Sequence, residues 1–592
     1  MLIVSGGLLL AWSRVVAASD PSARSASPAT QNANHIFNAV HSSMRQWGSS
    51  LHHNGMSVFV ATVPEGTQLY HGTSHSERVN ATEWLAFEPE HALVFARSRR
   101  PGFPPGRGHP PRGDGDHGRE DWYSRENMPE DLRETPKQEL KARHPHEPYE
   151  RRPLSHTMGQ SEPARVSSQQ IPLQDEPEED ATGYLHTYRV KHNLRLLYID
   201  GQSAAKSTKG TLDMQDFVLL HNAQPDADSR PPPRSHDFFR APPSEDGRPP
   251  PTGGVLNEGF RADHLCAMAR TDWAGKIDGF LRMELGFEII LCSFEDGLDV
   301  ERITLAKATN DPLGPGGITI NYYRAVASRF DGIGGDRVRI DYDNFVTLYT
   351  FDNAVSFAND GLPRANNDTK VVTPILEAIT NLALSESAAE KDSPDWQAVA
   401  DMVVSRYSDR IDYLTSGTII LNETDLKNEI EWAIRPYIDY NHRNKSLEIQ
   451  RCATQYFPSL LPPPPPPPPT ANNHNNHNNH KYKYNTTTTT APRAILHVTT
   501  HLCAAFFSAA EQPSTEEAIS TLRKLKQWLN WTTFKRCRTC AVNQVCFLPI
   551  WPAGGQEDFD HPKCVQSLEE IGEGYWGDWW RPRLLSPLRG DG

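Results

Sequence analysis

The sequence lacks long hydrophobic runs. Only 37% of its 592 residues are hydrophobic, and beyond the N-terminal segment no run approaches the roughly 20 apolar residues that a membrane-spanning helix needs. We therefore expect no transmembrane segment. The same shortage of apolar residues indicates that part of the chain lies outside any packed core.

The sequence also lacks an excess of basic residues. It contains 60 Lys and Arg against 74 Asp and Glu, which gives a formal net charge of -14. A surface that follows a phosphate backbone needs clustered Lys and Arg, and the sequence has no basic stripe. We therefore expect no nucleic-acid partner.

Three segments have no hydrophobic periodicity. Segments 99–180 and 223–256 are rich in Pro, Gly and charge, and they predict disordered insertions because they bury too little apolar surface to offset chain entropy. Segment 462–490 contains a polyproline run, an Asn/His tract and a threonine run, which predict a low-complexity linker. Its histidines, His474, His477 and His480, suit either a metal site or a solvated linker, and this composition favours the linker.

The N-terminal residues MLIVSGGLLLAWSRVVAAS are similar to a secretory signal peptide. An apolar core precedes small residues that suit cleavage after Ala18, so residues 1–18 are predicted to be removed. The chain also has N-x-S/T sequons, which are candidates for N-glycosylation: Asn80, Asn367, Asn422, Asn444, Asn485 and Asn530. We therefore expect a secreted glycoprotein, extracellular or held in the cell wall.

The cysteine content supports the same location. An even number of cysteines in an exported chain predicts a disulfide framework. Cys266 is a possible partner of Cys292, and Cys452 of Cys503. The other four could form disulfides or bind zinc, and an oxidising compartment favours disulfides; they are Cys537, Cys540, Cys546 and Cys564. The sequence alone does not fix the pairing of the cysteines from Cys452 onward.

The remaining N-terminal segments have clear periodicity. Alternating residues predict strands at 57–63, 184–190 and 194–199, and a short aromatic strand is followed by a helix that begins near Pro89. Two more strands are predicted in KIDGFLRMELGFEIIL. Strands outnumber helices without strict alternation, so the pattern predicts an α+β domain from about 35 to 350.

Beyond residue 390 the pattern is helical. It predicts a helical region at 390–461 and a Cys-rich helical domain at 491–575, tied by disulfides. Ser393 is predicted to cap the first helix, and Ser514 to form a capping box with Glu517. The apolar stripes of these helices are ordinary packing faces.

The motif order in the N-terminal part resembles the ADP-ribosyltransferase fold. The motifs are GTQLYHGT, then EWLAFEPEHALVFAR, then YLHTYRV with LRLLYID, and finally KIDGFLRMELGFEIIL. The resemblance covers Gly66 to Leu291. It implies a split antiparallel β-sheet domain, interrupted by the disordered insertions, and NAD as a cofactor.

The resemblance also implies roles for particular residues. His71 would hydrogen-bond the ribose hydroxyls of NAD, and Gly72, followed by Thr73, would offer backbone groups to the nicotinamide. A glycine suits that position because it lets the backbone approach a ligand closely. Glu288 would hold the nicotinamide ribose and stabilise positive charge as the glycosidic bond breaks. His71 and Glu288 are therefore the candidate catalytic residues.

The sequence departs from the family pattern at several points. Trp84 or Phe87 would have to supply the stacking aromatic ring. Gly286 stands where arginine-modifying relatives have Gln or Glu, and Glu284 and Asp216 are alternative carboxylates. The tRNA 2'-phosphotransferases share a similar start, but they act inside cells.

The C-terminal cysteine block resembles that of uncharacterised exported proteins of filamentous fungi, which pair it with the YHGTS domain. Two hypotheses follow. The chain is either an NAD-dependent ADP-ribosyltransferase or glycohydrolase with an unknown protein or glycan acceptor, or a non-catalytic secreted or wall-associated interaction protein that keeps the fold as a scaffold. The first hypothesis requires His71 and Glu288 to face one cleft.

Overall fold

A computed structural model describes sixteen stretches of the chain. They are residues 27–47, 51, 55–96, 183–202, 210–222, 258–283, 286–306, 323–326, 333–359, 361–385, 394–417, 422–457, 489–537, 539–549, 554–567 and 570–571. The predicted signal peptide, both predicted insertions and nearly all of the 462–490 linker lie outside these residues. Glu284 and Asn485 also lie outside them.

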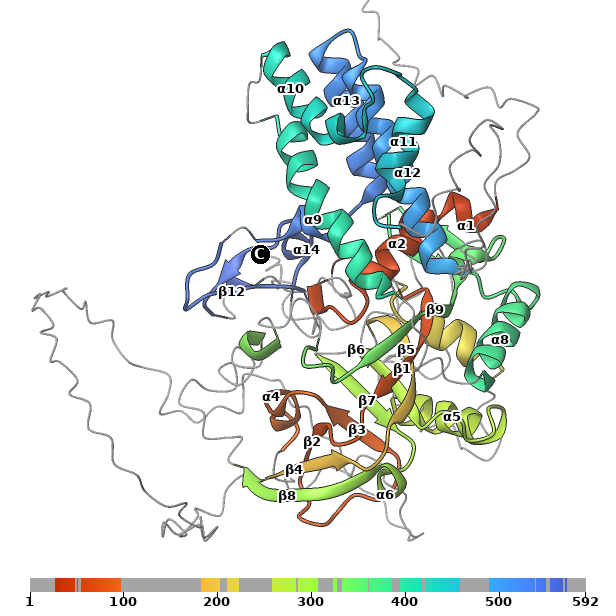
Figure 1. Ribbon diagram of the computed structural model, residues 1–592. Helices are drawn as coiled ribbons and strands as arrows, with labels where there is room; N and C mark the ends of the chain where they lie inside the picture. The colour runs from red at the N-terminus through yellow and green to blue at the C-terminus, as the bar shows by residue number, and fades with distance from the viewer. Residues whose placement is uncertain are drawn as a thin grey trace, which may run out of the picture. The chain divides into compact units, whose positions relative to one another are not determined.

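Nine strands form one hydrogen-bonded sheet in the order β8-β4-β2-β3-β7-β6-β5-β1-β9 (Figure 1). They are β1 (Ser57–Val63), β2 (Gln68–Thr73), β3 (Glu83–Ala86), β4 (Gly183–Val190), β5 (Leu194–Gln202), β6 (Gly279–Met283), β7 (Phe287–Leu291), β8 (Leu298–Ala306) and β9 (Arg339–Thr347). Neighbouring strands run antiparallel, except that β5 and β6 are parallel. The prediction of an α+β fold with a largely antiparallel sheet is confirmed.

The predicted division of the sheet into two is wrong. Pairing continues from β8 to β9, and it is thinnest between β2 and β3, where Tyr70 and Ala86 form the one registered pair among the described residues. Two small sheets lie apart from the large one. They consist of β10 (Val355–Phe357) with β11 (Pro363–Ala365), and of β12 (Val545–Cys546) with β13 (Cys564–Val565).

Helices precede, interrupt and follow the strands of the large sheet in the sequence. They make up most of the C-terminal part. The α-helices are α1 (Pro28–Gln31), α2 (Ala33–Ser42), α4 (Pro89–Leu93), α5 (Glu258–Thr271), α6 (Phe294–Gly297), α8 (Thr369–Leu384), α9 (Trp396–Thr415), α10 (Glu423–Ile434), α11 (Lys445–Thr454), α12 (Thr490–Ala510), α13 (Thr515–Leu529) and α14 (Gln556–Asp560). Shorter turns are the π-helix η4 (Met214–Leu219) and the 3-10 helices η6 (Leu348–Thr350), η7 (Arg435–Tyr437) and η9 (Thr532–Lys535).

The capping predictions had different outcomes. Ser514 accepts a hydrogen bond from the Glu517 amide at 3.2 Å, so its cap is confirmed. Ser393 lies outside the described residues, and the N-cap of α9 is Asp395 instead. The Asp395 carboxylate accepts from the Ala398 amide at 2.9 Å and satisfies the helix start instead.

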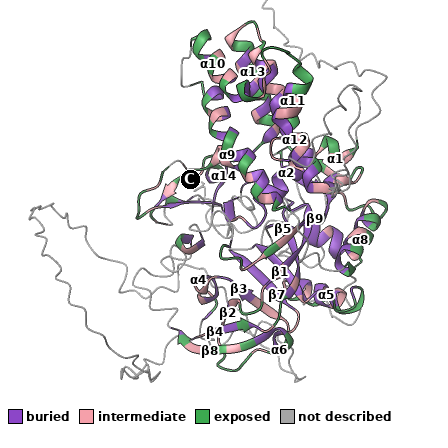
Figure 2. Ribbon diagram, viewed as in Figure 1, coloured by how far each residue is buried: buried purple, intermediate pink, exposed green. Residues whose placement is uncertain are grey.

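Both faces of the central strands are covered. One face carries Glu288 and is covered by α4, which packs on β2, β3 and β4, and by α5, which packs on β6. The other face carries Tyr198, whose hydroxyl accepts from the Met44 amide, just after α2, at 3.1 Å. Figure 2 shows the central strands as mostly buried.

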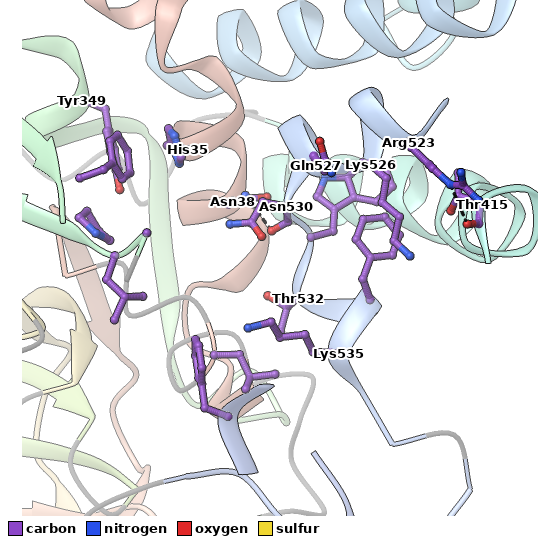
Figure 3. A pocket seen from close by; sticks show the side chains of 18 residues that line it. His35, Asn38, Tyr349, Thr415, Arg523, Lys526, Gln527, Asn530, Thr532 and Lys535 are labelled. Carbon is purple, nitrogen blue, oxygen red and sulfur yellow. Dashed lines mark hydrogen bonds between the residues drawn. The ribbon is translucent and has the colours of Figure 1, made fainter. Parts of the chain in front are cut away.

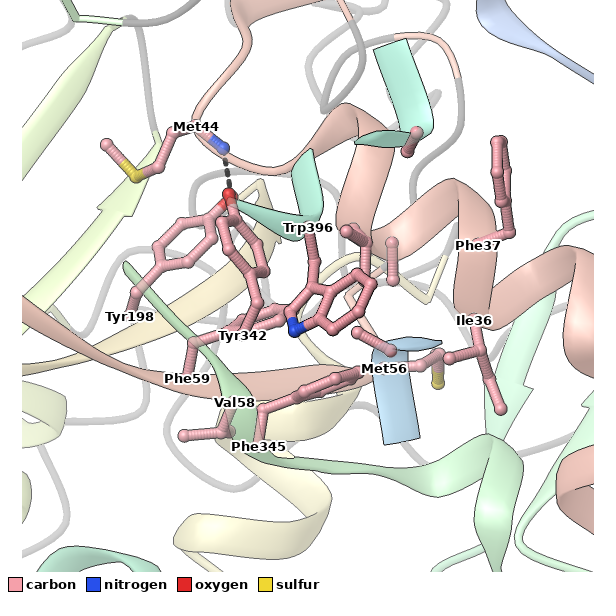
Figure 4. Close-up of a cluster of buried hydrophobic side chains, with 14 of the residues drawn as sticks. Ile36, Phe37, Met44, Met56, Val58, Phe59, Tyr198, Tyr342, Phe345 and Trp396 are labelled. Atoms are coloured by element: carbon pink, nitrogen blue, oxygen red, sulfur yellow. Dashed lines mark hydrogen bonds between the residues drawn. The ribbon is translucent and has the colours of Figure 1, made fainter. Parts of the chain in front are cut away.

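An aromatic cluster fills the space on the Tyr198 face, next to α2 (Figure 4). Phe59 stacks on Tyr198 with ring centroids 5.7 Å apart and on Phe345 at 4.5 Å. Trp396, the first residue of α9, donates its indole N–H to the Asp343 carboxylate at 2.8 Å. These rings join strands of the sheet to a helix that is distant in sequence.

Helix α2 connects the sheet with the C-terminal helices. It packs on α9 and α12. Asn34 donates to the Trp528 carbonyl at 2.7 Å, and Asn38 donates to the Leu529 carbonyl at 3.0 Å. One cluster of buried apolar residues runs through the sheet and helices α9 to α13. The predicted boundaries between 35–350, 390–461 and 491–575 therefore do not interrupt the hydrophobic core.

All eight cysteines form disulfides. Cys266 pairs with Cys292 and Cys452 with Cys503, as predicted. The four remaining cysteines form the pairs Cys537–Cys546 and Cys540–Cys564. The disulfide interpretation of the C-terminal block is confirmed over the zinc one, because a disulfide sulfur is not available as a thiolate ligand.

No helix in the described part of the chain is both long enough and apolar enough to cross a bilayer.

Asp200, on β5, is a buried carboxyl group whose charge has no cationic partner among the described residues. Its Oδ1 accepts from the Tyr198 hydroxyl at 2.8 Å, and among the described residues its Oδ2 has no side-chain partner. Burial raises the pKa of Asp200 to about 7. The folded protein therefore retains a proton that the unfolded chain has already lost between about pH 4 and pH 7.

We expect the free energy of unfolding to fall as the pH rises through this window and then to level off. A shift of this size corresponds to about 4 kcal/mol in total. Asp200→Asn should flatten the fall, as measured by urea unfolding at a series of pH values. Asp299→Asn, at an exposed carboxylate on β8, should leave the profile unchanged. An identical slope in the wild type and in Asp200→Asn would contradict the assignment.

Candidate functional site

Three adjacent strands and the residue that follows β3 carry the residues predicted to bind NAD. His71, Gly72 and Thr73 lie on β2, Trp84 lies on β3, and Glu288 lies on β7. Phe87 directly follows β3. Because β2, β3 and β7 are neighbours in the sheet, the fold brings together the strands that the sequence motifs identify.

The strand register places the two candidate catalytic residues on opposite faces. Tyr70 pairs with Ala86, and Ala86 pairs with Glu288, so these three side chains share one face. His71 follows Tyr70 in the strand and therefore has the other face. The expectation that His71 and Glu288 face one cleft is wrong. The physical reason is the alternation of side chains, which makes Tyr70 the β2 residue on the Glu288 side.

His71 is held in a defined orientation. Its Nδ1 lies 2.8 Å from the Trp84 carbonyl oxygen. A carbonyl only accepts, so Nδ1 carries the proton and Nε2 is a bare acceptor. Among the described residues Nε2 has no hydrogen-bond partner. The ring meets Phe294 edge to face, with centroids 5.9 Å apart.

His71 is also held neutral. Burial lowers the pKa of His71 to about 4, and the neighbouring His186 lowers it further, while the bond to the Trp84 carbonyl opposes the shift. His71 is therefore an uncharged hydrogen-bond acceptor at neutral pH, with no role as a proton donor through Nε2.

His186, which pairs with His71 across β4 and β2, is satisfied within the fold. Its Nε2 donates to the His75 carbonyl at 2.8 Å, and its Nδ1 lies 3.1 Å from the Tyr188 hydroxyl. That hydroxyl also accepts from the Val79 amide at 3.3 Å. Burial lowers the pKa of His186. This group of neutral rings fixes the loop 75–79 against the sheet.

Glu288 is part of a buried ion network on the opposite face. Its Oε1 accepts from Arg282 Nε at 2.8 Å, and the two side chains are 5% and 1% exposed. Arg282 also donates to Gln215 at 2.9 Å and to Glu258 at 2.5 Å. The guanidinium of Arg282 therefore links the late strand to η4 and to the start of α5.

A second arginine completes this network. Arg261 on α5 donates two bonds of 2.8 Å to Asp216, and a further bond of 3.0 Å to Glu258. Asp216, the predicted alternative carboxylate, is thus already held in a bidentate pair. Glu258 touches both arginines, and its side chain is the one member with substantial exposure, at 22%.

Gly72 makes a close approach, but to a helix. A side-chain Cβ built at this position would lie 1.8 Å from the Ala92 carbonyl oxygen, at the end of α4. The position does require a residue without a Cβ, whereas the predicted contact of Gly72 with the nicotinamide stays a prediction. The observed neighbour is the backbone of α4, which fills the space on that side of the strand.

The two candidate stacking rings have different surroundings. Phe87 is 1% exposed; the Arg337 guanidinium lies 5.9 Å from its ring centroid and donates to its carbonyl at 3.2 Å. Trp84 is partly exposed and pairs with Ile290, which places it on the Glu288 face. Of the two, Trp84 is the one with surface for a ligand.

The sequence prediction missed Arg282, although a signal was present. The stretch GFLRM is a strand whose five residues are all buried, and an arginine there needs a buried partner. Read in this way, FLRM and GFEII predict an ion pair across a hairpin. That interpretation gives Glu288 a structural role.

The described glycosylation candidates are exposed. Asn80, Asn367, Asn422, Asn444 and Asn530 all have exposed side chains, while Asn485 lies outside the described residues. Asn422 and Asn444 accept bonds that cap α10 and α11. Asn530 has a left-handed backbone, with φ of 46°, at the end of α13. Glycosylation of these residues stays a prediction.

Comparison with known proteins places the N-terminal half beside uncharacterised fungal proteins. Residues 28–314 match a family model described as the YPL277C N-terminal domain. The chain is 29% identical over 292 residues to the uncharacterized protein YOR389W of Saccharomyces cerevisiae, covering 48% of this chain and 35% of that protein. It is 29% identical over 289 residues to the uncharacterized protein YPL277C of the same yeast, covering 48% and 45%.

The match lies in the part of the chain that carries YHGTS, and the resemblance to an uncharacterised fungal family is supported there. The chain spans less than half the length of either relative. No solved structure matches significantly. Neither relative's name states a fold or an activity.

The network predicts a stability role for Glu288. Glu288→Gln removes the carboxylate at Arg282 Nε and leaves Glu258 as its remaining carboxylate partner, so we expect a loss of up to about 3 kcal/mol in the free energy of unfolding, measured with guanidinium chloride. The double variant Arg282→Met, Glu288→Leu should lose less than the sum of the two single variants.

Glu301→Gln is the matched control for this substitution. It breaks an exposed ion pair with Arg189, 2.9 Å long, and should cost no more than about 1 kcal/mol. Equal small losses for Glu288→Gln and Glu301→Gln would show that the Arg282 pair contributes little.

The packing of Gly72 yields a second prediction. Gly72→Ala forces its Cβ against the Ala92 carbonyl, so we expect a loss of about 1 to 3 kcal/mol from overpacking. Gly259→Ala, in open space within α5, should be neutral or gain up to about 1 kcal/mol in helix propensity. Thermal unfolding measures both, and an unchanged melting temperature for Gly72→Ala would contradict the close contact.

Proposed function

We propose that this chain is a secreted, disulfide-tied binding protein that keeps an ADP-ribosyltransferase-like set of strands as a non-catalytic scaffold. The observation that carries the proposal is the position of Glu288. Its carboxylate bonds Arg282 at 2.8 Å on the face of the sheet opposite His71. A transferase needs that carboxylate free to hold the nicotinamide ribose while its histidine contacts the same NAD molecule.

Two further observations support the proposal. The space beside Gly72 that would receive the nicotinamide contains the backbone of α4, and Phe87 is enclosed under Arg337. Of the five positions that the resemblance connects with NAD contacts on β2, β3 and after it, His71, Thr73 and Trp84 are partly exposed, whereas Gly72 faces α4 and Phe87 is buried. Catalysis by a transferase depends on polar groups that are aimed at the charge developing in the transition state.

Disulfides support the secreted location. Four disulfides in one chain are typical of an oxidising compartment, where thiols are not kept reduced. On this proposal the partner is an extracellular protein or glycan, and the chain is either released or held in the cell wall. The exposed sequon asparagines would carry glycans there.

The alternative is an NAD-dependent ADP-ribosyltransferase or NAD glycohydrolase. It draws on the YHGTS motif and on the neutral, oriented His71, whose Nε2 can accept a bond from a ribose hydroxyl. It requires Glu288 to leave Arg282 when NAD binds. Breaking a buried pair of this kind is costly, which is why we prefer the scaffold.

The decisive measurement is nicotinamide release. We expect the purified 19–592 protein, produced by secretion, to release no nicotinamide from NAD above the buffer blank, with an active transferase as the positive control. Release by the wild type that both His71→Ala and Glu288→Gln abolish would overturn the scaffold proposal. Because Glu288→Gln is expected to lower stability, each variant is assayed below its own melting temperature.

A further inference from the structure

A cavity of about 520 Å³ lies between α2, α13 and the segment that follows α13 (Figure 3), and its lining includes no residue of β2, β3 or β7. Its volume is within the range of small-molecule sites, about 300 to 1,000 Å³. Lining residues come from five separate parts of the chain, including the small β10–β11 sheet and α14.

Aromatic rings form much of the wall. Trp531, which is 2% exposed, stacks on Phe37 behind it and on Phe534, with centroids 5.9 and 5.7 Å apart. On the opposite side His35 stacks on Tyr349 at 5.1 Å and contacts Phe357 at 4.8 Å. Burial lowers the pKa of His35 to about 4, so this ring is neutral and adds to the apolar wall.

The charges of the cavity are all of one sign. Arg523, Lys526 and Lys535 line it, and its described lining includes no Asp or Glu, although the whole chain has a net charge of -14. Lys526 is neutralised by Asp412 at 2.7 Å. Within the described residues, Arg523 donates a long hydrogen bond, 3.4 Å, to the Thr415 carbonyl.

Among the described residues, Lys535 has no carboxylate counter-ion. Its ammonium lies 3.7 Å from the centroid of the Phe559 ring, and no described carboxylate is within ion-pair distance of it. Burial lowers the pKa of Lys535, and the more distant Asp560 only partly opposes this. Lys535 is a half-buried ammonium next to a ring and an open cavity. An anion bound there has a more favourable Coulomb energy with the ammonium than it would have in bulk water.

We propose that this cavity binds a small amphipathic anion, with an aromatic or otherwise apolar body against the rings and a carboxylate, sulfonate or phosphate at Lys535. Arg523 at the rim adds a second positive charge, which suits the entry of an anion. The inference does not depend on the proposed function, since it concerns different residues and holds whether or not NAD is cleaved.

The first test uses 8-anilino-1-naphthalenesulfonate as the probe and N-phenyl-1-naphthylamine as its neutral counterpart. We expect one site per chain by calorimetry and fluorescence, with the neutral compound bound about tenfold more weakly. Equal affinity for the two compounds, or no binding of the sulfonate up to about 1 mM, would overturn the proposal.

The second test changes the cation. Lys535→Met keeps the aliphatic stem and removes the charge, so the sulfonate should bind about tenfold more weakly while the neutral compound is unaffected. Lys427→Met, at an exposed residue of α10 paired with Glu423, is the matched control and should bind as the wild type does. Sulfonate affinity that is unchanged in Lys535→Met would overturn the proposal. The comparison of the sulfonate with the neutral compound uses the wild-type protein, so it does not depend on how either variant folds.

A third test separates a ligand from the chain's own glycan. Asn530 lines the cavity and is a sequon residue, so a sugar attached there could occupy the site. If the sulfonate binds only to Asn530→Gln and not to the secreted wild type, the glycan is the occupant and the anion proposal fails. Binding to both forms supports it.

Discussion

The alternation of side chains along the neighbouring strands β2, β3 and β7 is the constraint on which the rest of the N-terminal architecture depends. A strand covered on both faces sends alternate side chains into two separate cores, so each residue has one of only two environments. His71 enters the side with Phe294 and His186. Glu288 enters the side with Arg282 and α5. No cleft on one face of these strands can then contain both residues.

The same constraint explains the state of the polar groups. Where these strands are buried, a charged group must be paired and a titratable group tends to its neutral form. Glu288 and Asp216 are held by arginines, whereas His71, without a carboxylate beside it, has its pKa lowered. Gly72 is small because α4 lies directly on it. In the sequence, Glu288, His71 and Gly72 suggest a ligand site. In the structure, the same residue types are explained by ion pairing, burial and close packing within the fold, and we prefer a scaffold for this reason.

The sequence could predict local structure well, and the site poorly. Alternation in SVFVATV and the Pro89 start of α4 determined elements that depend on neighbouring residues only. Strand order was not accessible, because β7 pairs with β3 across a long sequence distance, although its pairing with β6 is a local hairpin. The one-residue register that separates His71 from Glu288 depends on the Tyr70 to Ala86 pair, and no motif encodes it. The aromatic cavity was missed for the same reason, since its walls come from distant segments.

The C-terminal cysteines and the cavity belong to one structural argument. The segment after α13 has little regular structure: β12 and β13 are two residues each, and α14 has five. Its small core, which includes Leu548 and Phe559, is too limited to hold it by burial alone. The disulfides Cys537–Cys546 and Cys540–Cys564 fix this segment, and with it the position of Phe559 beneath the Lys535 ammonium. The Phe559 wall of the cavity therefore depends on the oxidised state of these cysteines.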